Sequence, residues 1–237
     1  MHLYQSYRYL RNIISKRPHL YYFIGRFFKI KKFFINKNTD LVIEGFPRSG
    51  NSFLESCFKV LNKNIILAHH THSVAQVKMG IKKNLPVILL IRDPSEATKS
   101  AYFFYKKKLS YNFLIKEYID FYESLIIYKK NIVILDFKKI NNFKKILKYL
   151  QTNFDSLPKF DEKINNKNLK KKAIKKLISF SKARHHRAFR ESYINNNSTI
   201  SADRKKFAIE QNILKDQANI KLLKKAKQIY RKFKSIN

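Results

Sequence analysis

The sequence predicts an α/β fold in which an open parallel sheet is flanked by helices. Short apolar runs typical of strands alternate along the chain with segments of helical periodicity. One run, Val87 to Ile91, is unbroken, as expected for a strand of a parallel sheet that is covered on both faces. A glycine-containing turn joins the first predicted strand directly to a helix. The 237 residues, 44% of them hydrophobic, suffice for one domain with its own core.

Residues 1–40 form a basic, aromatic segment that we treat as a helical N-terminal extension. Apolar residues recur there at helical spacing in two series, Leu3, Tyr7, Leu10 and Ile14, then Leu20, Phe23, Phe27 and Ile30. Two interpretations stay open at this point. The helices either pack onto the main domain or lie as an interfacial pair on an anionic membrane surface.

Residues 41–237 are expected to form the α/β domain. The predicted strands cover 41–44, 64–68, 87–91 and 132–137. A helix is predicted after the first, third and fourth strands, and a further amphipathic helix from Phe113 to Leu125. Asp93 and Pro94 favour a helix start, because Asp caps helices and Pro suits the first helical position. Residues 155–203 are polar, and 181–199 are expected to form a long loop or flap near the site. The last thirty residues return to helical periodicity.

The turn after the first predicted strand has the composition of a phosphate loop. It runs from Gly45 to Ser52, and it contains two of the chain's four glycines, five residues apart. Backbone N–H groups in such a turn, together with a helix N-terminus, bind anions. Asn51 stands where the NTPase loop has its lysine, and Arg48 places a cation inside the loop instead. The loop is therefore expected to hold an anion other than ATP or GTP.

A second anion element follows the strongest predicted strand. Arg92 lies at the carboxyl end of that strand, and Ser100 lies about two turns into the next helix. The two side chains can therefore converge on one small anion. Taken alone, Arg92-Asp93-Pro94 indicates only a helix start, and its pairing with the phosphate loop favours an anion-binding role.

These two elements resemble those of the sulfotransferases that use 3′-phosphoadenosine-5′-phosphosulfate (PAPS). Phe46 to Leu54 is similar to the family's 5′-phosphosulfate loop, with Asn51 in place of the usual Thr. The resemblance implies a P-loop-like architecture, and it assigns the 5′-phosphosulfate to Arg48, Ser49, Gly50, Asn51 and Ser52. It assigns the 3′-phosphate to Arg92 and Ser100, and more weakly to Arg204, because Ser201 to Lys206 lacks the glycine of the corresponding family element.

Three of the seven histidines, His69, His70 and His72, lie at the end of the second predicted strand. His70 and His72 would share a face if that strand continued. Zinc binding, a structural role and general base chemistry are the alternatives, and zinc is disfavoured because no Cys or carboxylate lies nearby at ligand spacing. His70-Thr71-His72 resembles the Lys-Thr-His triplet of the cytosolic branch of the family. That resemblance makes His72 the expected base and leaves the role of His70 open. No metal is expected, because cations of the chain already hold the departing group.

The sequence therefore predicts an enzyme that transfers a sulfuryl group from PAPS to a hydroxyl or amine of a small molecule or glycan, with a carbohydrate as the favoured acceptor. Arg48 and His72 are the expected catalytic residues. The alternatives are a P-loop kinase or NTPase, in which Ile132 to Asp136 would be a Walker B strand, and a basic nucleic-acid-binding protein. No recognised nucleic-acid motif supports specific binding of that kind.

The bulk composition limits the partners and the cellular compartment that we expect for this chain. The formal charge of +35 predicts anionic partners, although a general bias toward Lys, Asn and Ile also accounts for it. The single cysteine, Cys57, is expected in the core, and its solitude suits a reducing compartment. No apolar run is long enough to cross a bilayer, so the expected location is the cytoplasm, with peripheral membrane contact possible.

Overall fold

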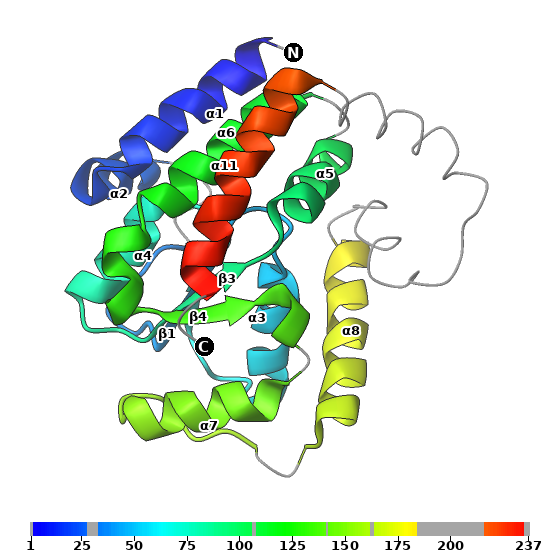
Figure 1. Ribbon diagram of the computed structural model, residues 1–237. Coiled ribbons are helices and arrows are strands. Elements are labelled where there is room, and N and C mark those ends of the chain that lie inside the picture. The colour runs from blue at the N-terminus through cyan, green and yellow to red at the C-terminus, as the bar shows by residue number, and fades with distance from the viewer. Residues whose placement is uncertain are drawn as a thin grey trace.

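The computed structural model describes residues 2–27, 33–105, 108–140, 142–161, 164–183 and 216–234 (Figure 1). Its centre is a sheet of four parallel strands in the order β2-β1-β3-β4. Helices cover both faces of this sheet. The predicted class, an α/β fold with an open parallel sheet flanked by helices, is confirmed.

The elements follow the predicted alternation, except that the helix after the second strand was not predicted. The strands are β1 (Leu41–Gly45), β2 (Leu67–His69), β3 (Val87–Ile91) and β4 (Val133–Asp136). The α-helices are α1 (His2–Ser15), α2 (Pro18–Gly25), α3 (Asn51–Leu61), α4 (Val74–Lys82), α5 (Pro94–Phe104), α6 (Tyr111–Glu123), α7 (Phe143–Asn153), α8 (Asn166–Ala183) and α11 (Gln217–Lys234). Two 3₁₀ turns, η2 (Ile126–Asn131) and η3 (Phe137–Lys139), flank β4.

Two hydrophobic clusters form the core, one on each face of the sheet. Alternate strand residues face opposite ways, so Ile43 and Leu90 join the cluster beneath α3, α7 and α8, whereas Val42 and Leu89 join the cluster beneath α4, α5, α6 and α11. Cys57 lies in the first of these with 1% of its surface exposed, as predicted. Burial raises the pKa of its thiol to about 12, so the thiol is unreactive at neutral pH.

The connections of β1 and β3 leave the sheet in opposite directions. After β1 the chain crosses to β2 on one side, and after β3 it crosses to β4 on the other side. The crevice at the carboxyl ends of β1 and β3 is therefore the topological switch point, where open parallel sheets bind their ligands. The predicted phosphate loop follows β1 and Arg92 follows β3, so both anion elements lie at this crevice.

Helices α1 and α2 pack on the outside of the layer that contains α4 and α6 (Figure 1). A buried ion pair fixes α1 there, since Arg8 Nη2 donates to both carboxylate oxygens of Glu117 at 2.7 and 2.8 Å. Asn12 adds a hydrogen bond to the same carboxylate. The inner face of α1 therefore packs onto the main domain, which is the first of the two interpretations given for the N-terminal segment.

Three predicted boundaries differ from the structure. The second strand was predicted at 64–68, but β2 begins at Leu67 because pairing with β1 starts at the match of Leu41 with Leu67. Residue 64 lies in the preceding turn. α2 ends at Gly25, so Phe27 of the second helical series lies beyond that helix, and Ile30 lies outside the described residues. The loop or flap predicted for 181–199 begins inside α8, and its remainder lies outside the described residues.

Candidate anion-binding site

The loop after β1 has the backbone geometry of an anion cradle. Arg48 and Gly50 both lie in the left-handed region, at φ 71° and 100°, and α3 begins directly afterwards with Gly50 as its N-cap residue. No side chain caps that helix start, and its first turn contains no acidic residue. A Cβ atom at Gly50 would approach the ring of Phe137 to 2.9 Å. Gly50 is therefore required for both its backbone conformation and its lack of a side chain.

The two predicted anion elements are in direct contact. Arg92 Nη1 donates to the carbonyl oxygen of Arg48 at 2.8 Å, and Arg48 Nε donates to Ser100 Oγ at 3.1 Å. Residues from the ends of two different strands and from α5 thus meet at the switch point. This contact places the guanidinium group of Arg92 against the backbone of the loop at Arg48, and both arginines are partly buried.

Aromatic rings hold the two guanidinium groups in position. The Arg92 group lies 4.4 Å from the ring centroid of Phe137, and the Arg48 group lies 4.9 Å from that of Phe104. Such cation–π contacts restrict a long side chain without neutralising its charge. Glu96 pairs with Arg92 at 3.3 Å from one turn along α5, where it is about half exposed.

Two tyrosines of α6 fasten the strand ends that carry the site. Tyr118 donates its hydroxyl to the carbonyl oxygen of Arg92 at 2.8 Å, and Tyr122 donates to that of Leu90 at 2.7 Å. The Tyr122 oxygen also accepts the backbone N–H of Phe46 at 3.2 Å, so one side chain ties β3 to the loop after β1. The helical spacing of these tyrosines predicts a shared face, but no signal in the sequence predicts their bonds to the strand ends.

His72 is held as a neutral imidazole with one nitrogen available as a base. Its Nδ1 lies 2.8 Å from the carbonyl oxygen of Gly45, which can only accept, so Nδ1 carries the proton and Nε2 carries the lone pair. Burial, followed by the proximity of His70, lowers the pKa of His72 well below the usual 6.5. His72 thus stays unprotonated at neutral pH, as a general base requires.

Glu44 fixes the backbone around His72. Its buried carboxylate accepts the N–H of Thr71 at 3.0 Å, the hydroxyl of Thr71 at 2.7 Å and the N–H of His72 at 2.8 Å. Burial raises the pKa of Glu44 to about 7, against the opposing effect of these bonds. Sequence reasoning did not identify Glu44, although a charged residue within an otherwise apolar strand is the signal that points to it.

The condition that the second strand continues through His70 and His72 is not met. β2 ends at His69, and His70 and His72 both adopt left-handed backbone conformations, at φ 59° and 47°. The turn nevertheless brings the two rings together, with centroids 5.9 Å apart. His70 Nε2 lies 2.6 Å from Ser52 Oγ, so this histidine contacts the phosphate loop.

The remaining predicted loop residues are placed differently from one another. Ser52 is partly exposed and bonded to His70, whereas Ser49 is fully buried. Asn51 is 3% exposed, and its Nδ2 points back to the carbonyl oxygen of Phe46 at 3.4 Å. The side chain of Asn51 is therefore directed inward, away from the N-terminus of α3. Arg204 lies outside the described residues.

A small cavity of about 20 Å³ opens beside His72. Its walls are the loop residues Phe46 and Pro47, the α1 residues Asn12, Ser15 and Lys16, and Glu117, Asp120 and Phe121 of α6. That volume holds about one water molecule. A larger cavity of about 560 Å³ lies elsewhere, between α3 and α7, with Leu61 and Leu147 among its lining residues.

Asp136, at the end of the predicted Walker B strand, is already occupied by protein groups. Its Oδ1 accepts the N–H of Lys138 at 2.9 Å, and its Oδ2 accepts the Tyr230 hydroxyl at 2.6 Å. This carboxylate caps the start of η3, and its bond with Tyr230 links α11 to the end of β4. Those bonds disfavour the role of magnesium ligand that an NTPase would give it.

The strand order defines an α/β protein with an open parallel sheet, and two elements that carry arginines meet at the carboxyl edge of that sheet. No family model and no curated protein matches the chain. Among solved structures, the chain is similar to the crystal structure of mouse sulfotransferase SULT7A1 complexed with PAP. The TM-score is 0.43 and the identity 13%, over 83% of this chain and 91% of that chain.

Proposed function

We propose that this chain is a PAPS-dependent sulfotransferase. The observation that carries the proposal is the contact of Arg48 with Ser100 and of Arg92 with the Arg48 carbonyl, at the switch point of a parallel sheet. The wording of both motifs supports PAPS over other phosphorylated ligands, because the loop lacks the NTPase lysine and the Arg92–Ser100 spacing is that of the 3′-phosphate element. The basic, aromatic surface supports a carbohydrate as acceptor.

The proposed reaction needs positioned charge and one base. Sulfuryl transfer breaks the bond between sulfur and the phosphate oxygen of the donor and forms a bond from sulfur to the acceptor oxygen or nitrogen. His72 Nε2 takes the proton of the acceptor, since its lone pair is free of the bond that Nδ1 makes. Arg48 and the loop N–H groups stabilise the charge that develops on the leaving phosphate. The second product is 3′-phosphoadenosine-5′-phosphate (PAP).

A panel of ligands in a thermal-shift assay tests this class of function. We expect PAPS and PAP to raise the Tm by roughly 5–10 °C at a hundredfold excess over Kd, because binding then adds about 2.7 kcal/mol to stability. ATP, GTP and a short RNA are expected to give much smaller shifts. Arg92→Ala should remove most of the PAP shift, whereas Arg231→Ala, an exposed arginine on α11, should leave it unchanged.

Other outcomes of the panel would point to the alternatives. Stabilisation by ATP with Mg²⁺ but not by PAP would favour a kinase or NTPase. Salt-sensitive binding of RNA with no response to PAP would favour a nucleic-acid-binding protein. Either result would overturn the proposed function.

A further inference from the structure

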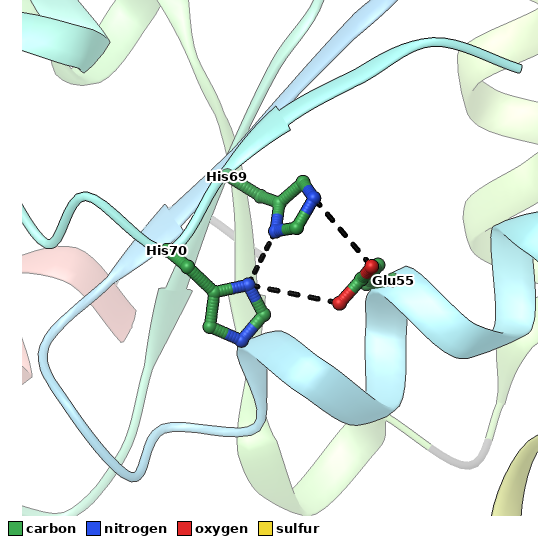
Figure 2. A group of neighbouring side chains, drawn as sticks. All are labelled: Glu55, His69 and His70. Atoms are coloured by element: carbon green, nitrogen blue, oxygen red, sulfur yellow. Dashed lines mark hydrogen bonds and ion pairs between the residues drawn. The ribbon is translucent and has the colours of Figure 1, made fainter. Parts of the chain in front are cut away.

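Beside the anion site, the fold gathers a carboxylate and two imidazoles that the sequence does not bring together. Glu55 comes from the second turn of α3, His69 is the last residue of β2, and His70 follows it (Figure 2). One ligand atom from each of the three residues lies within 4.8 Å of the other two. Within the described ranges, this is the one group of three or more His, Cys, Asp or Glu residues arranged in this way.

The distances suit a four-coordinate metal ion. His69 Nε2 lies 3.5 Å from one oxygen of Glu55, and His70 Nδ1 lies 3.6 Å from the other. Ligands at about 2.0–2.1 Å from a tetrahedral zinc ion are about 3.3–3.4 Å apart, so each nitrogen lies near that separation from one oxygen of Glu55, the two nitrogens facing different oxygens. The Nδ1 atoms of the two rings are in contact with each other (Figure 2). His69 can instead offer Nε2, the nitrogen that faces Glu55.

A hydrogen bond behind His70 fits the same role. Histidines that bind a metal through one nitrogen usually donate the N–H of the other to a nearby acceptor, which fixes the tautomer. His70 Nε2 lies 2.6 Å from Ser52 Oγ, on the side of the ring opposite to Nδ1. The ring of Phe33 packs at 5.2 Å from His69 and 6.2 Å from His70, which limits their movement.

We propose that Glu55, His69 and His70 bind a divalent transition metal ion, with Zn²⁺ as the ion of choice. Two imidazoles and one carboxylate form a ligand set that zinc uses with a fourth position left for water or a ligand. All three side chains are at least partly buried, with 17% of Glu55 and 22% of His70 exposed, so an ion can enter and yet be shielded.

The ion would also act on the phosphate loop, and this part alone rests on the proposed function. A metal on His70 Nδ1 leaves the proton on Nε2, so His70 donates to Ser52 Oγ. The Ser52 hydroxyl then keeps its own proton for an anion in the loop. Metal binding is therefore expected to tighten the binding of PAP.

Metal binding is tested on the full chain without nucleotide. After equilibration with Zn²⁺ and removal of free ion, we expect elemental analysis to find one ion per chain, and titration calorimetry to give the same stoichiometry. Glu55→Gln and His69→Ala should each weaken zinc binding by at least about tenfold. His19→Ala, which removes an exposed histidine of α2, should leave it unchanged. Co²⁺ in the wild-type protein should show the visible absorption of a four-coordinate ion.

Three results would overturn the metal site. The first is the absence of bound ion, the second is a zinc affinity that Glu55→Gln and His69→Ala do not alter, and the third is a Co²⁺ spectrum of six-coordinate type. PAP affinity, measured with and without Zn²⁺, then tests the coupling to the loop separately. If PAP binds without metal and zinc has no effect, the coupling fails while the proposed function stands. If PAP does not bind in either state, the proposed function fails while the metal site stands.

A second observation concerns the outer surface of α1 and α2. Nine of the thirteen large hydrophobic side chains that are exposed in the described part of the chain belong to residues 3–27: Leu3, Tyr4, Tyr7, Tyr9, Leu10, Ile13, Leu20, Phe23 and Phe27. The inner face of α1 is occupied by the buried Arg8–Glu117 pair, so this apolar surface is directed outward. An exposed apolar concentration of this kind marks an interaction surface.

The positive charge around this apolar surface indicates what kind of partner it binds. Residues 1–39 contain no Asp or Glu, and Lys16, Arg17 and Arg26 are exposed on or beside the two helices. Apolar and aromatic side chains flanked by cations are typical of helices that lie in the headgroup region of an anionic bilayer. No helix among the described residues is long and apolar enough to cross a membrane. We infer that α1 and α2 bind the surface of an anionic membrane.

Cosedimentation with vesicles tests this second inference. The full chain should bind vesicles of phosphatidylcholine with phosphatidylserine better than vesicles of phosphatidylcholine alone. Combined Leu10→Glu and Phe23→Glu substitutions should weaken binding by at least about tenfold. Each one removes an apolar side chain that would be buried in the bilayer, and each adds a negative charge that the anionic lipids repel. Ile127→Glu, at a position 78% exposed in η2, is the matched control. Equal binding by the variant and the control would overturn the inference.

Discussion

Replacing Arg48 with Ala is expected to lower sulfuryl transfer by roughly 10²–10³-fold, the loss seen when one preorganised donor to a developing charge is removed. Arg48 is the cation inside the loop, and its hydrogen bond to Ser100 and its contact with Phe104 hold it at the switch point. Turnover of PAPS with a model acceptor, measured at saturating donor, gives the loss in kcat. Arg48→Lys should retain more activity, because the charge remains while the planar fork is lost.

The backbone at residue 48 supplies the control for this substitution. At φ 71°, Ala stays in a strained left-handed conformation, whereas Gly adopts it freely. Arg48→Gly should therefore be at least as stable as Arg48→Ala by thermal unfolding, and should be equally inactive. Recovery of activity in Arg48→Gly would show that the guanidinium group is not needed and that the alanine variant failed through its backbone.

Removing the base should have an effect of similar or larger size. We expect His72→Asn to lower kcat by about 10²–10⁴-fold, the usual contribution of a positioned general base, while PAP binding changes little. Asn tolerates the left-handed conformation at φ 47°, and its amide N–H₂ can keep the bond that His72 Nδ1 makes to Gly45. The asparagine variant thus removes Nε2 with less disturbance than His72→Ala. Full activity in either variant would exclude His72 as the base.

The pH dependence of kcat separates His72 from an ordinary exposed histidine. Burial lowers the pKa of His72, so its base form persists as the pH falls through 6.5. The acidic limb of the kcat profile should therefore lie well below pH 6.5. A limb at or above 6.5 would contradict the neutral, buried state of this imidazole.

The parts of the fold that local sequence determines were predicted well. A strand that ends in a glycine turn and a helix, and an Asp-Pro pair that begins another, are set by neighbours in the chain. α3 follows the glycine turn as predicted, and α5 begins at the predicted Pro94, with Asp93 accepting from Ser95 at 2.9 Å and from Glu96 at 3.3 Å. The start of β2 was not predicted, because the register with Leu41, and not the apolar run itself, selects Leu67 as its first residue.

The parts of the site that depend on packing could not be predicted from the sequence. Glu55 precedes His69 by 14 positions, and only the placement of α3 beside β2 brings its carboxylate to the two rings. The sequence thus disfavoured zinc because no carboxylate lay at ligand spacing, and the fold supplies one. Tyr118 and Tyr122 reach the carbonyl groups of Arg92 and Leu90 across more than twenty residues of chain for the same reason.

The carboxylate of Glu117 serves two neighbours at once: it pairs with Arg8 and it walls the cavity beside His72. The positive charges of Arg8 and Arg11 help to keep the imidazole deprotonated, after the larger effects of burial and of His70. A chain that begins after Ser15 would lack Arg8 and Arg11. The Glu117 carboxylate near His72 would then lose its ion pair with Arg8. A chain shortened in this way would lose more than a surface helix, because the pKa of His72 would rise and its imidazole would be exposed to bulk solvent.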